Sequence, residues 1–566
     1  MGFKQNGLGK CGLGLIWMLV LACHGSRKEL PKRREIVEQP KELSQRTSDN
    51  IRIALAYAED NHGLINDSIQ LNHLDVLKDW YESRSFAPVW VHPPSWAPVA
   101  DSLYEFIQNS MYSGLFPADY GSRSLLSIRD RLHRNTFDEK DAVLWSLGDL
   151  ILTDAFIGMT HDLAFGRIPR DSTTLRKDSV FTKEQYEVFL HQVLDSGQSV
   201  SAFFQEKEPG LRGYRELKKA LGAFLDTARF QHFTPVAYPT HPSLDSLALI
   251  QHLLARFKEE KLVGDTVSAY DSLHWAQTVK IVQRAKGLKA DGIPGPVLVN
   301  ALNQTDEEKF RIAALNMDRY KLLPDSTVMP KEFVWVNLPG YYLQVWNDDS
   351  LQFQSKVIVG HPETRTPELS SRLSNFITYP VWTVPESIIY KEMLPKIQRS
   401  TSYLTAQNLV VVNDRDSILD PTKLPWHRYH KDNFPYRIRQ LEGNDNSLGV
   451  IKFNFANKYS VYLHDTNERD LFSNAKRDLS HGCVRVQDWK KLAGYLVRSD
   501  SVRYPLDTIK AWIARSAKHT VYFKDRIPLY LRYYTCDGKD GRLIFYDDIY
   551  GEDKYLLTKY LDRQVR

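Results

Sequence analysis

Two short segments hold the side chains best suited to nucleophilic chemistry. The first ends in His464 and continues with Asp465, and the second reads Ser480-His-Gly-Cys483. A thiol is a strong nucleophile only when it is deprotonated, and a nearby histidine can take that proton. We therefore predict Cys483 as a nucleophile and His464 as its base. His481 is an alternative base because it is only two residues from the thiol.

The main chain around the thiol could also contribute to catalysis. Gly482 would let a substrate approach the backbone closely, because glycine has no side chain to obstruct it. Consecutive N–H groups at Gly482 and Cys483 could then form an oxyanion hole, which stabilises the negative charge of a tetrahedral intermediate.

Cysteine is sparse in this chain, with four in 566 residues. If a leader is removed and Cys23 carries a lipid, Cys483 and Cys536 are the thiols that remain. In an oxidising compartment a disulfide between them is the alternative to a reactive thiol. The Ser-His-Gly-Cys sequence has no packing explanation, however, so we predict a reactive Cys483 and a buried free thiol at Cys536.

The N-terminus resembles an export signal. Lys4 and Lys10 precede an apolar segment at 11–22, which is shorter than the ~20 residues that span a bilayer. Val20-Leu-Ala-Cys23 is similar to a bacterial lipobox, with valine in place of the usual leucine. We predict a lipoprotein-type signal at 1–23 and a diacylated Cys23 that anchors the protein to a bacterial membrane, which implies a periplasmic location. An ordinary cleaved signal is the alternative.

Composition indicates a globular, multi-domain α+β protein. Hydrophobic residues make up 42% and charged residues 25% of the chain. At roughly 150 residues per domain, this length favours three or four domains. The net charge of +5 is too small for this length to indicate a nucleic-acid partner.

The pattern of the chain predicts a succession of units. A charged, proline-containing tether at 24–49 precedes a helical scaffold at 50–240, then amphipathic helices at 241–325 that include GLKADGIPG. Alternating β-branched and aromatic residues predict a mainly β unit at 331–540. A polar, helix-leaning insertion at 386–446 is too long for an ordinary loop and would cap this unit. Residues 541–566 are predicted as a C-terminal tail.

Several of these segments resemble known families. HDT…LSHGCVRV is similar to the catalytic signature of the L,D-transpeptidases with a YkuD-type domain, and SKVIVGHPETRTPELSS, PVWTVPESI and LGVIKFNF extend the likeness. The order of the units resembles the large, multi-domain periplasmic members. The 241–325 helices resemble the three-helix peptidoglycan-binding domain, but Pro296 stands where that family has a small polar residue. A spacer without a ligand is the alternative there.

The resemblance implies a specific reaction on peptidoglycan stem peptides, with no cofactor and no metal. Cys483 would attack the L-centre carbonyl of diaminopimelate in a tetrapeptide stem, and the terminal D-alanine would leave. The resulting thioester would be resolved by the side-chain amine of a second stem, which gives a diaminopimelate–diaminopimelate L,D cross-link. His464 would act first as base and then as acid. Carbapenem β-lactams would acylate Cys483, because they mimic the terminal amide of the donor.

The resemblance also implies roles for the surrounding residues. The main-chain carbonyl of Asp465 would orient the imidazole, and the amides of Gly482 and Cys483 would bind the oxyanion. Arg485 would position substrate or brace the loop, with a structural salt bridge as the alternative. The remaining candidates shape the motif loop or line the pocket, although core packing is an alternative for the last two: Ser480, His481, Trp382 and Tyr462.

Other functions remain open from the sequence. Water as the acceptor would make the protein an L,D-carboxypeptidase, and a protein amine would make it an enzyme that attaches proteins to the wall. The insertion at 386–446 favours transpeptidation, because a cap would exclude water. A non-catalytic, wall-binding lipoprotein would not need both Cys483 and His464. A papain-like peptidase is disfavoured, because in that class the cysteine precedes the histidine.

Overall fold

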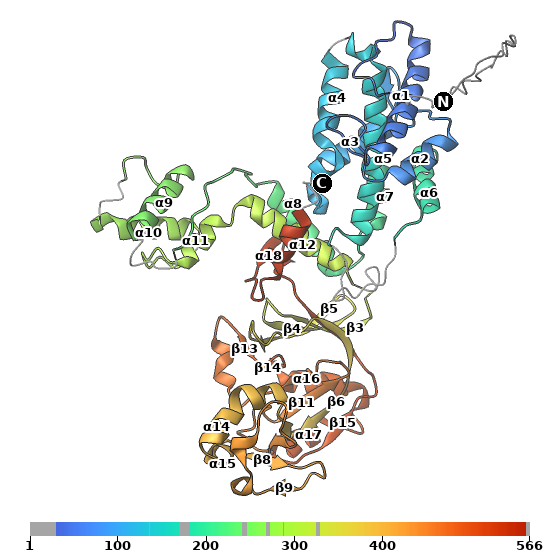
Figure 1. Ribbon diagram of the computed structural model, residues 1–566. Helices are drawn as coiled ribbons and strands as arrows, with labels where there is room; N and C mark the ends of the chain where they lie inside the picture. The colour runs from blue at the N-terminus through green and yellow to red at the C-terminus, as the bar shows by residue number, and fades with distance from the viewer. Residues whose placement is uncertain are drawn as a thin grey trace, which may run out of the picture. The chain divides into compact units, whose positions relative to one another are not determined.

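The structure is a computed structural model that describes residues 30–134, 136–168, 180–239, 246–267, 272–286, 288–323 and 329–561. The predicted signal at 1–23, with Cys23, lies outside these residues. The described chain is helical in its N-terminal part and mainly β in its C-terminal part (Figure 1), which confirms the predicted α+β class.

The N-terminal part consists of helices. The apolar helix α5 ends at Phe165, and Gly166 follows it with a φ of 79°, the left-handed conformation that commonly ends a helix. By length and composition α5 is the one helix among the described residues that could cross a bilayer, but 89% of its most apolar stretch is buried in the protein, as in a core helix. The bounds of the helices are α1 Pro40–Asp60, α2 Leu74–Ser83, α3 Pro98–Gln108, α4 Ser122–Arg134, α5 Ala142–Phe165, α6 Lys183–Leu194, α7 Val200–Lys207 and α8 Arg212–Leu225.

A buried carboxylate organises part of this helical region. Asp149 on α5 is fully buried and accepts hydrogen bonds from the main-chain amides of 89–91, the segment that contains the start of the short strand β1 (Val91–His92). Burial raises the pKa of Asp149 to about 6, although these hydrogen bonds favour its charged form.

The predicted tether at 24–49 is wrong at its C-terminal end. Helix α1 begins at Pro40, with proline in the first turn, where its missing N–H costs nothing. Leu43 and Thr47 on this helix are buried, so the sequence from Pro40 belongs to the folded scaffold. Two charged residues of the predicted tether, Lys41 and Glu42, lie on the exposed side of this helix.

Three helices between 246 and 303 share a small core: α9 Ser246–Glu259, α10 Ser272–Ala285 and α11 Pro296–Asn303. Pro296 occupies the first turn of α11, and Gly292 in the preceding turn has a φ of 79°. The predicted boundary at 325 is too late. Helix α12, Asp306–Lys321, packs its apolar side with α8 in a different core.

The C-terminal part is built on a ten-stranded sheet that closes on itself. The order β11-β12-β14-β5-β4-β3-β16-β6 returns to its start because β11 also pairs with β6, while β13 and β15 pair at its margins. The strands are β3 Glu332–Asn337, β4 Tyr342–Asn347, β5 Ser350–Gly360, β6 Leu369–Thr378, β11 Ile451–Phe455, β12 Leu463–His464, β13 Asp478–Ser480, β14 Val484–Val486, β15 Thr520–Tyr522 and β16 Pro528–Arg532.

Alternate side chains along each strand point to the inside of the closed sheet and form its core. Val334, Leu343, Val357, Phe453 and Leu463 are fully buried and belong to one core. Helices α16 (Trp489–Val497) and α17 (Leu506–Ala514) add apolar side chains to the same core.

The insertion is a small domain with its own core, and it begins at β7, before the predicted start at 386. It was predicted to lean toward helix, but a four-stranded sheet, β7-β10-β8-β9, forms its frame. Trp426, Tyr429 and Ile438 are buried in its core, and Figure 1 shows α14, α15, β8 and β9 gathered together. The elements are β7 Trp382–Thr383, α13 Glu386–Ile388, a π-helical turn Ile389–Met393, α14 Leu394–Arg399, α15 Ser402–Ala406, β8 Leu409–Val412, β9 Ile418–Leu419 and β10 Arg437–Gln440.

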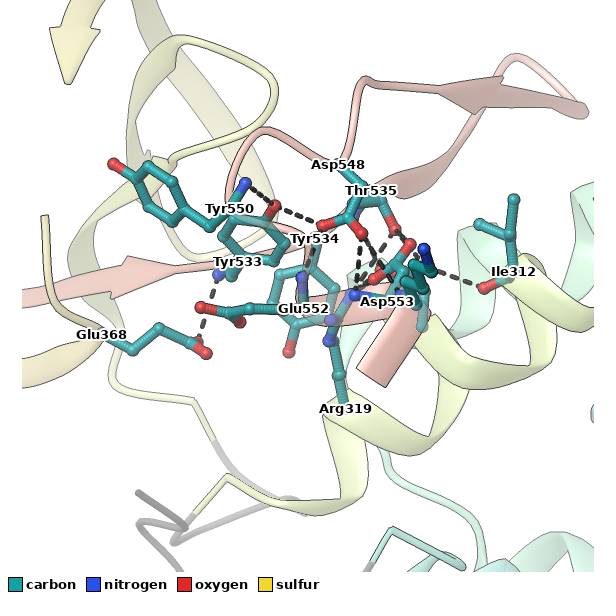
Figure 2. Close-up of polar contacts among 12 residues, drawn as sticks. Ile312, Arg319, Glu368, Tyr533, Tyr534, Thr535, Asp548, Tyr550, Glu552 and Asp553 are labelled. Atoms are coloured by element: carbon teal, nitrogen blue, oxygen red, sulfur yellow. Dashed lines mark hydrogen bonds and ion pairs between the residues drawn. The ribbon is translucent and has the colours of Figure 1, made fainter. Parts of the chain in front are cut away.

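The predicted tail at 541–566 is also corrected. The hairpin of β17 (Cys536–Lys539) and β18 (Arg542–Phe545) crosses the predicted boundary, and α18 (Glu552–Leu561) follows it. Figure 2 shows polar contacts that link this segment to α12, including a buried ion pair of 2.7 Å between Arg319 and Asp553.

Candidate active site

The register of two parallel strands brings the predicted nucleophile and base to one face of the sheet. Leu463 on β12 pairs with Val484 on β14, and both side chains point into the core. His464 pairs with Arg485, and the amide of Val484 donates to the carbonyl of Tyr462 at 3.1 Å. Because side chains alternate along a strand, His464 and the thiol that precedes Val484 lie on the opposite face, away from the core.

The thiol of Cys483 is free and half-buried. Cys536 is also free and fully buried, so the alternative of a disulfide between them does not occur. Burial raises the pKa of the Cys483 thiol, whereas hydrogen bonds from the main chain and hydroxyl of Tyr462 lower it. The Sγ atom lies 4.0 Å from the carbonyl oxygen of Ser460. The raised pKa therefore favours the protonated thiol until a base accepts its proton.

His464 is suited to be that base because it is neutral. Its side chain is buried, and burial, reinforced by the charges of Arg485 and Lys452, lowers the pKa of the imidazole to about 3. Main-chain oxygens of Asp465 and Leu448 act in the opposite direction on that pKa, although Nδ1 has no hydrogen bond of normal geometry. A neutral imidazole can accept a proton at physiological pH.

The carboxylate of Asp465 does not face the histidine. It accepts a hydrogen bond from the amide of Val450 at 3.0 Å and pairs with the guanidinium of Arg469, whose Nε lies 3.1 Å from Oδ1. The part of Asp465 that acts on His464 is thus its main chain.

The loop that carries the thiol is held by its own serine. Ser480 Oγ donates to the carbonyl of Cys483 at 2.6 Å and accepts from the amide of Gly482 at 3.2 Å. Gly482 has a φ of 110°, which L side chains rarely adopt. Its amide is committed to Ser480, so the prediction that it binds the oxyanion is not supported here. The amide of Cys483 is the better candidate.

His481 points to the cap. Its Nε2 lies 2.6 Å from Oε1 of Glu392, which lies on the π-helical turn of the insertion. An exposed ring engaged in this way is poorly placed to serve as the alternative base. Sequence reasoning missed Glu392, because no local signal relates residues separated by 89 positions.

Arg485 forms the salt bridge that was left open as an alternative. Its guanidinium lies 2.6 Å from Glu468 and 3.3 Å from the hydroxyl of Thr466. The ion pair braces the segment that follows His464 against β14. Sequence reasoning also missed Glu468.

Tyr462 and Trp382 lie beside the thiol, as pocket-wall residues would. The Tyr462 ring is 5.6 Å from the His464 ring and its hydroxyl is engaged by both Cys483 and Trp382. Trp382 is half-buried on β7, the first strand of the insertion. The insertion therefore contributes a side chain next to the nucleophile.

A second layer of hydrogen bonds supports the nucleophile loop. Thr366 Oγ1 donates to the carbonyl of Gly482 at 2.8 Å and accepts from the amide of Gly360 at 2.9 Å. The hydroxyl of Tyr550 accepts from the amide of Thr366 at 3.1 Å and donates to the carbonyl of Gly360 at 2.9 Å. Figure 2 shows how Tyr533 and Asp548 hold the main chain of Tyr550 in turn.

Removal of the Tyr550 hydroxyl should therefore disturb the loop. Tyr550→Phe leaves the amide of Thr366 and the carbonyl of Gly360 unpaired, which we expect to cost ~1–3 kcal/mol in the free energy of unfolding and to slow modification of Cys483. Denaturant unfolding and thiol-alkylation rates would measure both effects. Tyr522→Phe, at an exposed tyrosine, is the matched control. Equal behaviour of the two variants would contradict the supporting role.

Comparison with known proteins agrees with this geometry. Residues 331–503 match the L,D-transpeptidase catalytic domain, YkuD, and residues 75–221 match a scaffold domain. A Haemophilus influenzae protein whose name assigns it provisionally to the L,D-transpeptidases is 35% identical over 244 residues. That match covers 43% of this chain and 48% of the relative, so it spans about half of the relative's length.

Proposed function

We propose that this chain, whose residues 331–503 match the L,D-transpeptidase catalytic domain, YkuD, cross-links peptidoglycan stem peptides through Cys483. The observation that carries the proposal is the pairing of β12 with β14. It sets a half-buried thiol and a neutral His464 on one face of the sheet.

Each step assigns a bond and a proton to a residue of this chain. His464 takes the thiol proton as Sγ attacks the L-centre carbonyl of diaminopimelate in the donor stem. The C–N bond to D-alanine breaks, and the imidazolium returns the proton to the leaving amine. The product is a thioester on Cys483. The side-chain amine of a second stem then attacks this carbonyl and gives its proton to His464. The C–S bond breaks, and the imidazolium returns that proton to the sulfur of Cys483.

The cap favours an amine as the acceptor. Glu392 and Trp382 belong to the insertion and lie against His481 and Tyr462, so the insertion borders the reaction site. A covered site restricts the access of water to a thioester. Water as the acceptor, which would make an L,D-carboxypeptidase, and a protein amine, which would make a protein-attaching enzyme, are the alternatives.

The remaining parts of the chain fit an exported wall enzyme. We propose a lipid anchor at Cys23, a periplasmic location, and binding of peptidoglycan by the α9–α11 unit. Carbapenems would acylate Cys483, and intact mass after incubation with a carbapenem would show an adduct that Cys483→Ala lacks.

The test of function uses protein without residues 1–23, incubated with disaccharide-tetrapeptide and followed by mass spectrometry. We expect a cross-linked dimer that has lost one D-alanine. Cys483→Ala should abolish it, whereas Cys536→Ala, at the buried thiol, should retain it. Tripeptide alone would identify water as the acceptor. Product from Cys483→Ala would overturn the proposed nucleophile.

A further inference from the structure

Lys452 brings a third strand to the reacting face. It lies on β11 and pairs directly with His464 on β12. Its neighbours Ile451 and Phe453 are fully buried in the core, so the side chain of Lys452 points to the other face, with the imidazole. Directly opposed side chains in antiparallel strands have Cβ atoms ~5 Å apart.

The ammonium group of Lys452 is close to the nucleophile. Its Nζ lies 3.9 Å from the centre of the Tyr462 ring, and the hydroxyl of that tyrosine is engaged by Cys483. The charge of Lys452 favours the thiolate form of Cys483 and lowers the pKa of His464. The lysine thus faces the atoms that would react.

This ammonium group has no carboxylate partner among the described residues, although the lysine is partly buried. The other cations near the reacting pair are neutralised. Arg485 pairs with Glu468, and Arg469 pairs with Asp465. A desolvated ammonium without a counter-ion is costly, and an anionic ligand would offset that cost.

The proposed donor has a carboxylate in a suitable position. In a tetrapeptide stem the scissile amide joins diaminopimelate to the terminal D-alanine, so the free carboxylate belongs to the leaving residue and lies close to the carbonyl under attack. A pentapeptide stem would carry its carboxylate one residue farther away, and a C-terminal amide would lack the charge.

We propose that Lys452 binds the terminal carboxylate of the donor stem and selects stems that end at the leaving residue. This inference rests on the proposed function. The aromatic face of Tyr462 holds the ammonium toward the reaction site, since a cation is attracted to the face of an aromatic ring. Binding of the carboxylate would also offset the positive charge that disfavours the imidazolium form of His464.

The test compares two donors, tetrapeptide and its C-terminal amide, for binding and for turnover. Binding to Cys483→Ala protein is measured by calorimetry, which needs no reaction and thus separates this inference from the proposed function. We expect the free carboxylate to bind ~10- to 100-fold more tightly than the amide, as for a charge-assisted hydrogen bond. Lys452→Met in the same background should abolish that preference, and Lys452→Arg should retain part of it.

A matched control is Lys458→Met. Lys458 lies on the loop after β11 with its Nζ 5.2 Å from the Tyr459 ring, so it is a similar lysine on an aromatic ring away from the paired strands. It should leave the preference for the carboxylate unchanged. Equal affinity of the parent for both donors, or an undiminished preference in Lys452→Met, would overturn the inference. A third outcome would also overturn it. If Lys452→Met in protein that retains Cys483 lowered the turnover of both donors equally and shifted the pH profile of Cys483 alkylation, Lys452 would act through the thiol.

Discussion

Replacing His464 with glutamine should lower the rate of Cys483 acylation by ~10²–10⁴-fold, the usual contribution of a general base. Glutamine approximates the size of the imidazole and can form hydrogen bonds, but it cannot accept the thiol proton. The rate is measured by single-turnover mass spectrometry with tetrapeptide donor. His481→Gln is the matched control, because that ring contacts Glu392 on the cap. A larger loss from His481→Gln would reverse the assignment of the base.

The pH profile of the unmodified protein gives a second view of this residue. Since the pKa of His464 is lowered to about 3, the imidazole should remain neutral throughout the range from pH 7 to 5. We expect no fall in kcat/KM over that range from titration of this base, whereas an ordinary histidine would lose activity near pH 6.5. A limb near pH 6.5 that disappears in His464→Gln would contradict the lowered pKa.

The same shift links His464 to stability. The unfolded chain binds a proton at this histidine below about pH 6.5, but the folded protein does so only near pH 3. Stability from this group is therefore fully present above pH 6.5 and is lost as the pH falls toward 3, at up to ~1.4 kcal/mol per pH unit. Between pH 7 and 4.5 the parent should lose ~2–3 kcal/mol more than His464→Gln in denaturant unfolding.

The sequence was sufficient for those parts of the site that are local along the chain. The alternating residues of 331–337 and 451–455 indicated strands, and both occur as β3 and β11. The interval between His464 and Cys483 gave no direct evidence of contact. It was the resemblance of the motif, and then the β12–β14 register, that brought them to one face.

The parts that could not be predicted depend on pairing between distant segments. The cap forms a sheet from strands that are each two to four residues long, too short for a periodic signal to stand out from loops. Tyr550 reaches Thr366 across 184 residues, and Lys452 belongs to the reacting face only because β11 pairs with β12. The hydrogen bond from the amide of Gly482 to Ser480 depends on a turn geometry that is not visible in the composition of the motif.

Helix α18, which follows the residues 331–503 that match the catalytic domain, should prove essential to the stability of the fold. Arg319 on α12 and Asp553 on α18 form an ion pair with both side chains buried, and Thr535 donates to the same carboxylate. Asp553→Ala would leave a guanidinium buried without its partner, which we expect to lower the free energy of unfolding by ~3–5 kcal/mol. Lys554→Ala, at the exposed neighbour, should change it by less than ~0.5 kcal/mol.

The double variant Arg319→Met/Asp553→Leu separates the charge from the packing. If the cost of Asp553→Ala is an uncompensated buried charge, removing both charges should recover most of the lost stability. Helix α18 could also hold Tyr550 in place, because Tyr550 lies three residues before Asp553 and its hydroxyl binds the amide of Thr366 beneath the nucleophile loop. In that case Asp553→Ala should slow alkylation of Cys483. Recovery of stability and alkylation together in the double variant would establish that the helix acts on the nucleophile loop through its attachment to α12. If the double variant recovered stability but not the rate of alkylation, the contacts that hold Tyr550 would be assigned to Tyr533 and Asp548 instead.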